Sequence, residues 1–234
     1  DELCGPLERG NLMVIGGQTK AGKSMLSGQI ALNLGLSGIP VLYVSLEMTE
    51  RELTLRMLAS LARVNMRMVR MWNEGEYQRF HAAQTRLALA PIHIACRRFE
   101  LSEIMAVTQQ FYSRYAATET PLGCVVLDYA QMASGTRKKS DDRRQQEIAE
   151  ISRTCKRLAT KLNVLFILLS QLNDDGRSRE ARDIEFDANL MVEVGHDKES
   201  GDRGVKVILA RSAPSGQVLP IRIIAEHTRC EDES

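Results

Sequence analysis

Short apolar runs alternate with longer amphipathic stretches along most of the chain. Eight runs have the length and composition of β-strands, and they cover Leu12–Ile15, Val41–Val44, Ile92–Ile94, Cys124–Leu127, Val164–Leu169, Leu190–Val194, Val205–Ala210 and Val218–Ala225. Five stretches with helical periodicity cover Lys23–Leu36, Glu50–Ala62, Tyr77–Ala90, Leu101–Ala116 and Gln145–Leu162. The central strands are apolar without alternation, which is typical of parallel strands covered on both faces. The pattern therefore predicts an α/β fold with a mostly parallel, twisted sheet flanked by helices.

The last predicted strands have no helix between them. Antiparallel strands need only a short turn, whereas parallel strands need a crossover connection, so we expect antiparallel strands at the C-terminal edge of the sheet. No repeat, linker or boundary interrupts the pattern, and residues 1–234 are expected to form a single domain. The chain runs almost directly from Asp1 into its first motif, which suggests a domain excised from a longer protein.

The composition is typical of a globular cytoplasmic protein. Hydrophobic residues make up 44% of the chain, enough for a sizeable core, and the net charge of +1 gives no whole-chain sign of a nucleic-acid partner. The five cysteines are scattered, which favours reduced thiols in a cytoplasmic protein over disulfides or a zinc site. No signal peptide or membrane-length apolar run is present, so no membrane partner is expected.

One segment matches the G-x-x-x-x-G-K-[ST] pattern of phosphate-binding loops. It consists of Gly17, Gln18, Thr19, Lys20, Ala21, Gly22, Lys23 and Ser24. It follows a predicted strand and opens a predicted helix, which is the context that the motif requires and argues against a chance match. Backbone N–H groups and the helix N-terminus favour a phosphate there. Lys23 is expected to reach the β- and γ-phosphates of a nucleotide, and Ser24 to bind Mg²⁺.

A second predicted strand, Cys124–Leu127, is followed by an acid, Asp128. At the carboxyl edge of the sheet this carboxylate can hold the magnesium shell, as the Walker B acid of nucleotide hydrolases does. A strand-end aspartate can also cap a turn, but the phosphate-binding loop favours the metal role.

Two further side chains follow strands at the same predicted edge. Glu47 can orient and deprotonate an attacking water, or it can interact with the dipole of the helix that starts near Thr49. Gln171 can sense the γ-phosphate through its amide, or it can satisfy loop backbone groups.

Several segments together resemble the DnaB-type replicative DNA helicases. In order along the chain they are Ser45–Met48, Asp128–Met132, Glu147–Arg153 and Leu169–Asn173. The resemblance extends from Asp1 to about Thr228, and the order of several motifs makes it more specific than the phosphate-binding loop alone.

This resemblance implies a RecA-like P-loop motor domain that assembles into a homohexameric ring. It implies ATP and Mg²⁺ as cofactors, hydrolysis between subunits, and 5′→3′ translocation on single-stranded DNA. A primase or a helicase loader is a further implied partner. By the same resemblance Glu47 is the catalytic glutamate and Gln171 the phosphate sensor. Arg56 occupies the position of an arginine near the nucleotide, although a surface salt bridge would explain it equally well.

The family's arginine finger belongs to a Lys-x-Arg pair followed by a Gly-Pro-x-Gly turn. When Pro214 and Gly216 are aligned with that turn, Arg211 falls on the finger and Leu209 replaces the lysine. An arginine that reaches a neighbouring site would stabilise charge on the transferred phosphoryl group. The alternative is an arginine that only flanks a hairpin turn.

The sequence also departs from the family. The stretch between Gln171 and Ile184 is much shorter than the family's channel-lining loop, and we expect residues 1–234 to comprise the motor domain without the family's N-terminal domain and linker helix.

Two basic clusters follow the strands that end at Asp128 and Gln171. They consist of Arg137, Lys138, Lys139, Arg143 and Arg144, and of Arg177, Arg179 and Arg182. Both are expected at the phosphate edge, where basic side chains can follow a single-stranded DNA backbone. Solvated surface loops are the alternative, and neither cluster contains an aromatic residue for base stacking.

The leading hypothesis is an ATP-driven replicative DNA helicase motor. The second is a RecA-like ATPase switch, recombinase-like or loader-like, that binds DNA or a replication partner without unwinding. A small-molecule kinase is a third and weaker interpretation, because no lid-like arginine cluster is evident.

Overall fold

A central sheet organises the molecule in the computed structural model, which describes residues 7–96, 100–128, 141–171, 184–196, 203–216, 218–219 and 221–232. Within these ranges the sheet has eight strands in the order β3-β2-β4-β5-β1-β6-β7-β8. Their bounds are β1 Leu12–Gly17, β2 Val41–Ser45, β3 Ile92–Cys96, β4 Cys124–Asp128, β5 Leu165–Gln171, β6 Leu190–His196, β7 Arg203–Ala210 and β8 Val218–Leu219.

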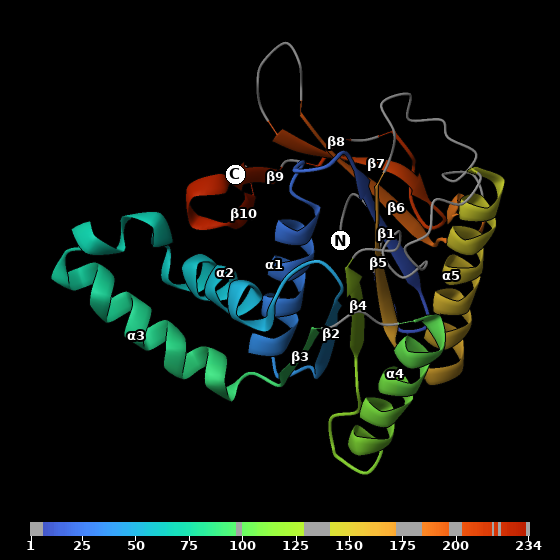
Figure 1. The fold of residues 1–234 in the computed structure, drawn as a ribbon, viewed down its shortest axis with the longest axis horizontal. Helices are drawn as coiled ribbons and strands as arrows, with labels where there is room; N and C mark the ends of the chain where they lie inside the picture. The colour runs from blue at the N-terminus through green and yellow to red at the C-terminus, as the bar shows by residue number, and fades with distance from the viewer. Residues whose placement is uncertain are drawn as a thin grey trace.

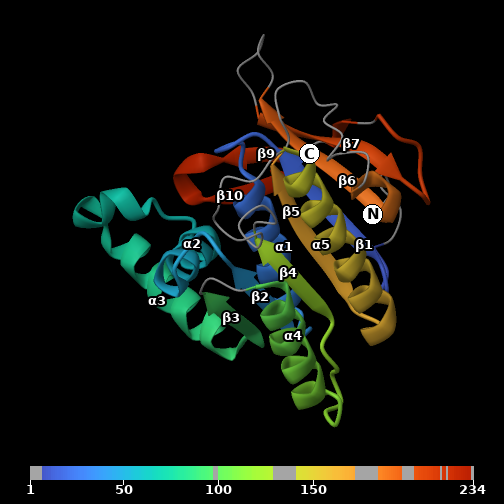
Figure 2. The ribbon, with the colours of Figure 1, turned by 45° about the vertical axis from the view of Figure 1, so that its right-hand side comes forward.

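Helices cover both faces of this sheet (Figure 1). Their bounds are α1 Lys23–Leu36, α2 Glu50–Ala62, α3 Glu74–Leu89, α4 Leu101–Tyr115 and α5 Asp141–Leu162, with short 3₁₀ helices η1 Met66–Met71 and η3 Ala225–His227. Figures 1 and 2 show α1, α2 and α3 on one side of the sheet and α4 and α5 on the other. In the described part of the chain, no helix combines the length and apolarity needed to cross a bilayer.

The strand pairing confirms the predicted fold class. Strands β1 to β6 pair in parallel, whereas β6–β7 and β7–β8 are antiparallel at one edge. Because β1 lies between β5 and β6, the phosphate-binding loop that follows β1 emerges from the middle of the sheet.

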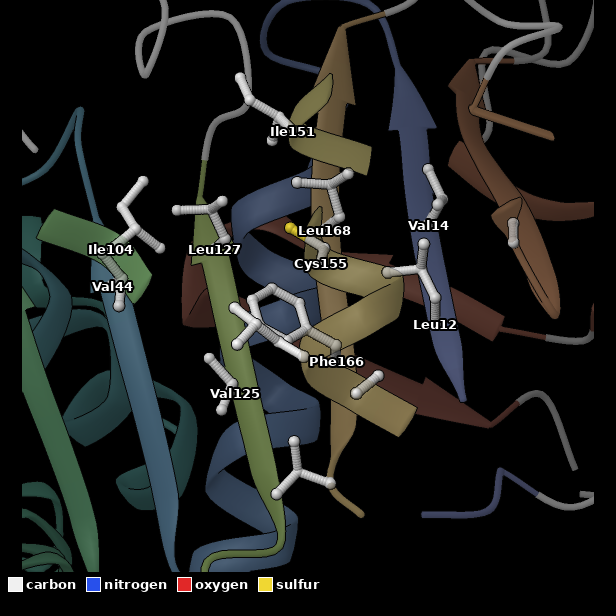
Figure 3. Close-up of a cluster of buried hydrophobic side chains, with 14 of the residues drawn as sticks. Leu12, Val14, Val44, Ile104, Val125, Leu127, Ile151, Cys155, Phe166 and Leu168 are labelled. Carbon is white, nitrogen blue, oxygen red and sulfur yellow. The ribbon is translucent and has the colours of Figure 1, made fainter. Parts of the chain in front are cut away.

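Alternate strand residues form two cores, one on each face. The α5 side contains the buried side chains Leu12, Val14, Val125, Leu127, Phe166 and Leu168, against which Ile151 and Cys155 of α5 pack (Figure 3). The other side contains Ile15, Tyr43, Val126 and Ile167, packed against Leu26 of α1 and Leu53 of α2. This two-sided burial explains why the central strands have no polar alternation.

The C-terminal region differs from the prediction of one strand over Val218–Ala225. The structure has β8, then β9 (Ile221–Ile224), while Ala225 begins η3. The residue between these two strands, Pro220, lies outside the described residues. Strand β9 pairs instead with β10 (Arg229–Asp232), which the hydrophobic pattern did not predict, and the two form a separate small sheet.

Candidate nucleotide-binding site

Four parallel strands end at the same edge of the sheet and bring the candidate residues together. Gly17 at the end of β1 is level with Gln171 of β5, and Asp128 of β4 is level with Ser45 of β2. Carboxyl ends of parallel strands are the usual ligand edge of α/β sheets. The arrangement therefore groups the phosphate-binding loop with both candidate acids.

The phosphate-binding loop requires glycine at two places. Gly17 has φ 149°, and a Cβ there would lie 2.4 Å from the carbonyl oxygen of Val194 on β6. Gly22 has φ 118°, immediately before the first residue of α1. L-residues rarely adopt these conformations, so the glycines allow the turn from β1 into α1.

Lys23 lies inside the loop rather than in solvent. Its Nζ donates hydrogen bonds to the carbonyl oxygens of Gly17, at 2.9 Å, and Gln18, at 2.8 Å. Burial lowers the pKa of the ammonium group, and the negative charges of Asp128 and Glu47 oppose that shift. The loop thus holds a cation at its centre, where it can bind phosphate oxygens.

Asp128 is buried and lies beside the loop's serine. Its carboxylate accepts a hydrogen bond from the Tyr43 hydroxyl at 3.1 Å and another from the side chain of Ser24. Burial raises the pKa of the Asp128 carboxyl, and these two hydrogen bonds oppose the shift. Tyr43 is held in turn by the Ser27 hydroxyl on α1, at 2.8 Å. A carboxylate and a hydroxyl are hard oxygen ligands, so this pair fits Mg²⁺.

Glu47 lies on a tight turn between β2 and α2. The Ser45 hydroxyl accepts a hydrogen bond from the Met48 N–H at 3.0 Å, and this contact closes the turn. The N-terminus of α2 is capped by Thr49 and Glu52 in a reciprocal capping box. The exposed Glu47 lines the same cavity as Lys23, and its negative charge acts on the Lys23 ammonium group.

Gln171 contacts the phosphate-binding loop directly. Its Nε2 donates a 2.6 Å hydrogen bond to the Thr19 hydroxyl. This contact connects the end of β5 to the loop and is compatible with both the sensing and the structural interpretations.

A cavity of about 790 Å³ lies beside the phosphate-binding loop and extends well beyond it. Its phosphate end contains Lys23, Ser24, Glu47 and Asp128. Arg56 lines the rest of the cavity, as predicted for a residue near the nucleotide. The other lining residues there were not predicted from the sequence: Met25, Met48, Leu55, Ala59, Asn65, Met66, Arg67, Ala225, Glu226 and Thr228. Leu55 and Ala59 share a face of α2 next to Arg56, which the helical periodicity could have indicated. The residues from η3 carry no comparable sequence signal.

Arg211 lies at the opposite edge of the sheet. It follows Ala210, which is level with Leu190 and Met13 at the start of β1, whereas the phosphate-binding loop follows the end of β1. Its guanidinium donates hydrogen bonds to the carbonyl oxygens of Ala188 and Phe186, at 2.8 and 2.6 Å. Met13 and Gly17 are four positions apart along β1, which corresponds to roughly 13 Å at 3.3 Å per residue.

The predicted DNA-binding clusters are not described by the structure. Arg137, Lys138, Lys139, Arg177, Arg179 and Arg182 lie outside the described residues. Arg143 and Arg144 lie in helix α5, but their side chains are not among the parts that the structure describes.

The sequence is similar to known replicative helicases. The family model described as "DnaB-like helicase C terminal domain" matches residues 1–199. The chain is 30% identical to the replicative DNA helicase DnaC of Bacillus subtilis over 240 residues, which cover 93% of the chain and 52% of that relative. It is 32% identical to the replicative DNA helicase DnaB of Buchnera aphidicola subsp. Schizaphis graminum, over 91% of the chain and 49% of that relative. The chain thus spans about half the length of these two relatives.

Solved structures share the fold. The ATPase domain of G40P superposes with a TM-score of 0.82 at 22% identity, covering 96% of the chain and 85% of that domain. A structure titled "The Structure Of A DnaB-Like Replicative Helicase And Its Interactions With Primase" also gives 0.82, at 21% identity, over 96% of the chain and 57% of its own. The chain therefore has the RecA-like fold of helicase ATPase domains.

Proposed function

Since the chain belongs to the family of DnaB-like helicase C-terminal domains, we propose that it is the ATP-hydrolysing motor of a replicative DNA helicase. The observation that carries the proposal is the single cavity that contains Lys23, Ser24, Asp128 and Glu47. A loop cation, a hydroxyl–carboxylate pair and an exposed second carboxylate are the groups that nucleotide hydrolysis requires.

Each group has a distinct task in this proposal. Lys23 exchanges its hydrogen bonds to Gly17 and Gln18 for bonds to the β- and γ-phosphates, since its ammonium already lies within the loop. Ser24 and Asp128 would hold Mg²⁺, which when bound neutralises charge on the phosphates. Glu47 accepts a proton from the attacking water. Gln171, hydrogen-bonded to Thr19, relays the state of the loop to β5.

The proposed motor also involves a neighbouring subunit and DNA. Because Arg211 lies at the opposite edge of its own sheet, we assign it to the site of a second copy, in a hexameric ring. The ring would translocate 5′→3′ on single-stranded DNA that contacts the two basic clusters. Primase is a proposed partner, because a similar solved helicase is described together with it.

Two substitutions test the hydrolytic assignment. Lys23→Ala is expected to abolish ATP binding, because the loop loses its central cation. Glu47→Gln is expected to retain ATP binding but to lower turnover at least about a hundredfold, because general-base catalysis is lost. Equilibrium binding and steady-state ATPase rates measure the two effects.

Matched controls are available on the same chain. Lys161→Ala at the exposed end of α5 and Glu50→Gln in the exposed first turn of α2 should leave both quantities unchanged. Normal turnover in Glu47→Gln would refute the assignment of the water-activating base.

The short stretch after Gln171 keeps a second function in view, a RecA-like switch that binds DNA or a partner without unwinding. Strand displacement on forked DNA separates the two proposals. A chain that hydrolyses ATP with DNA but separates no strands would favour the switch.

A further inference from the structure

The C-terminal segment Ile221–Glu231 contributes three residues to the lining of the nucleotide cavity. Figures 1 and 2 both show β9 and β10 beside α1 and above α2, apart from the main sheet. Ala225, Glu226 and Thr228 of this segment line the cavity together with Arg56 of α2 and Asn65 at the start of η1. Residues roughly 160–170 positions apart in the sequence thus line the same cavity.

The apolar side of the segment packs against the phosphate-binding loop and its helix. Ile221, Ile223 and Cys230 pack against the core that contains Leu26 of α1. Ile223 lies so close to the loop that a Cβ on Gly22 would be 3.3 Å from its Cδ1 atom. Burial of Cys230 raises the pKa of its thiol to about 11, so this sulfur packs as a neutral, apolar group.

A hydrogen bond and ion pairs connect the segment to the C-terminal end of α2. Arg229 donates to the Ser60 carbonyl at 3.3 Å and forms a 2.8 Å ion pair with Glu231. Glu231 lies 3.7 Å from the guanidinium of Arg63, the C-cap residue of α2. The Ser60 carbonyl belongs to the last turn of α2, where carbonyl groups lack helical partners and attract cations. We call Arg63, Arg229 and Glu231 the latch.

The latch joins a polar network that reaches α1. The Ser60 hydroxyl donates to Oε1 of the buried Gln29 on α1, at 2.7 Å. The Thr228 hydroxyl donates to the backbone carbonyl of Arg56 at 3.1 Å. These contacts therefore connect α1, α2 and the C-terminal segment around the cavity.

We propose that the segment Ile221–Glu231 is the nucleoside-side wall of the cavity, and that the latch positions this wall so that the base and ribose contribute to nucleotide affinity. Arg229 and Glu231 are positioning residues, since they are not among the residues that line the cavity but belong to the segment that does. The inference rests on the proposed nucleotide site. Its ligand is a nucleoside triphosphate, whose phosphates lie at Lys23 and whose nucleoside extends toward Arg56 and Thr228.

The test compares two ligands that share the phosphates but not the nucleoside. Affinities for Mg²⁺·ATP and for inorganic tripolyphosphate with Mg²⁺ are measured on the unmodified chain and on Arg229→Met and Glu231→Gln. Loss of a charged hydrogen bond in the latch is expected to weaken ATP binding about tenfold, equivalent to about 1.4 kcal/mol. Tripolyphosphate affinity should stay the same.

Arg79→Met is the matched control. Arg79 donates to the Ala62 carbonyl at 3.1 Å, so it contacts the same end of α2, but it comes from α3 rather than from the wall. This variant should show a comparable loss of thermal stability and an unchanged ratio of the two affinities.

The remaining outcomes overturn the inference. Equal weakening of both ligands by the latch variants would mean that the latch merely stabilises the phosphate-binding loop. An unchanged ratio in every variant would refute the wall while leaving the proposed ATPase intact. If the unmodified chain bound neither ligand, the wall and the proposed function would fall together.

Discussion

At the scale of single residues, the phosphate-binding loop was predictable because its chemistry is local. The motif identified Gly17, Gly22 and Lys23, and the structure gives both glycines positive φ angles and buries the lysine among loop carbonyls. The close approach of Val194 to Gly17 was not predictable, because it depends on the pairing of β6 with β1. The same limit applies to Thr228, whose contact with α2 joins residues at opposite ends of the chain.

Gly17→Ala tests the loop geometry. Its Cβ would lie 2.4 Å from the Val194 carbonyl oxygen at a φ of 149°, so we expect a shifted loop, weaker ATP binding and a cost of about 1–3 kcal/mol in unfolding free energy. Gly28→Ala in α1 is the control, since a Cβ there meets no atom within 4 Å. It should raise stability by up to about 1 kcal/mol through helix propensity. Identical melting and ATP binding in both variants would contradict the steric argument.

At the scale of secondary-structure elements, the sequence predicted those that begin at a local signal and missed those that depend on tertiary pairing. The predicted bounds of α1 and α2 match the structure, because a phosphate-binding loop precedes one helix and a capping box begins the other. Helix α3 begins at Glu74, before the predicted Tyr77, where Asn73 and Glu76 form a second capping box that the periodicity did not include. Strand β10 was missed because its polar sequence is stabilised by pairing with β9 and not by a hydrophobic pattern.

The capping box of α2 can be tested with Thr49→Ala. The Thr49 hydroxyl accepts a hydrogen bond from the Glu52 N–H at 3.3 Å, and its loss should cost about 1 kcal/mol, which lowers the melting temperature by roughly 2–4 °C. Hydrogen bonds from Thr49 lower the pKa of Glu52. The stabilisation that Glu52 adds to the folded state is therefore complete above its ordinary pKa. It is lost as the pH falls through the lowered pKa of the folded state.

Thr85→Ala is the control for this prediction. Thr85 lies within α3 and donates only to the His81 carbonyl four residues earlier, so alanine should not lower stability there. Calorimetric melting of the two variants between neutral and acidic pH measures both effects. Equal melting temperatures would show that the capping box contributes nothing.

At the scale of the whole molecule, two features depend on the assembled sheet. The cavity collects residues from Thr19 to Thr228, and the alternation of strands and helices predicted its phosphate end but not its nucleoside side. The other feature is the separation of Arg211 from the phosphate-binding loop, because antiparallel β7 returns the chain to the start of β1. A cation at that edge has a role in hydrolysis only if a second copy supplies the site. We therefore propose an ATPase whose active site is completed between subunits.

The decisive measurement is the ATPase rate per subunit across protein concentration, with and without single-stranded DNA. We expect a rate that rises with concentration and again with DNA, and an Arg211→Ala variant that binds ATP normally but stays slow at every concentration. A rate per subunit that ignores concentration, or an Arg211→Ala variant that matches the unmodified chain, would contradict this proposal.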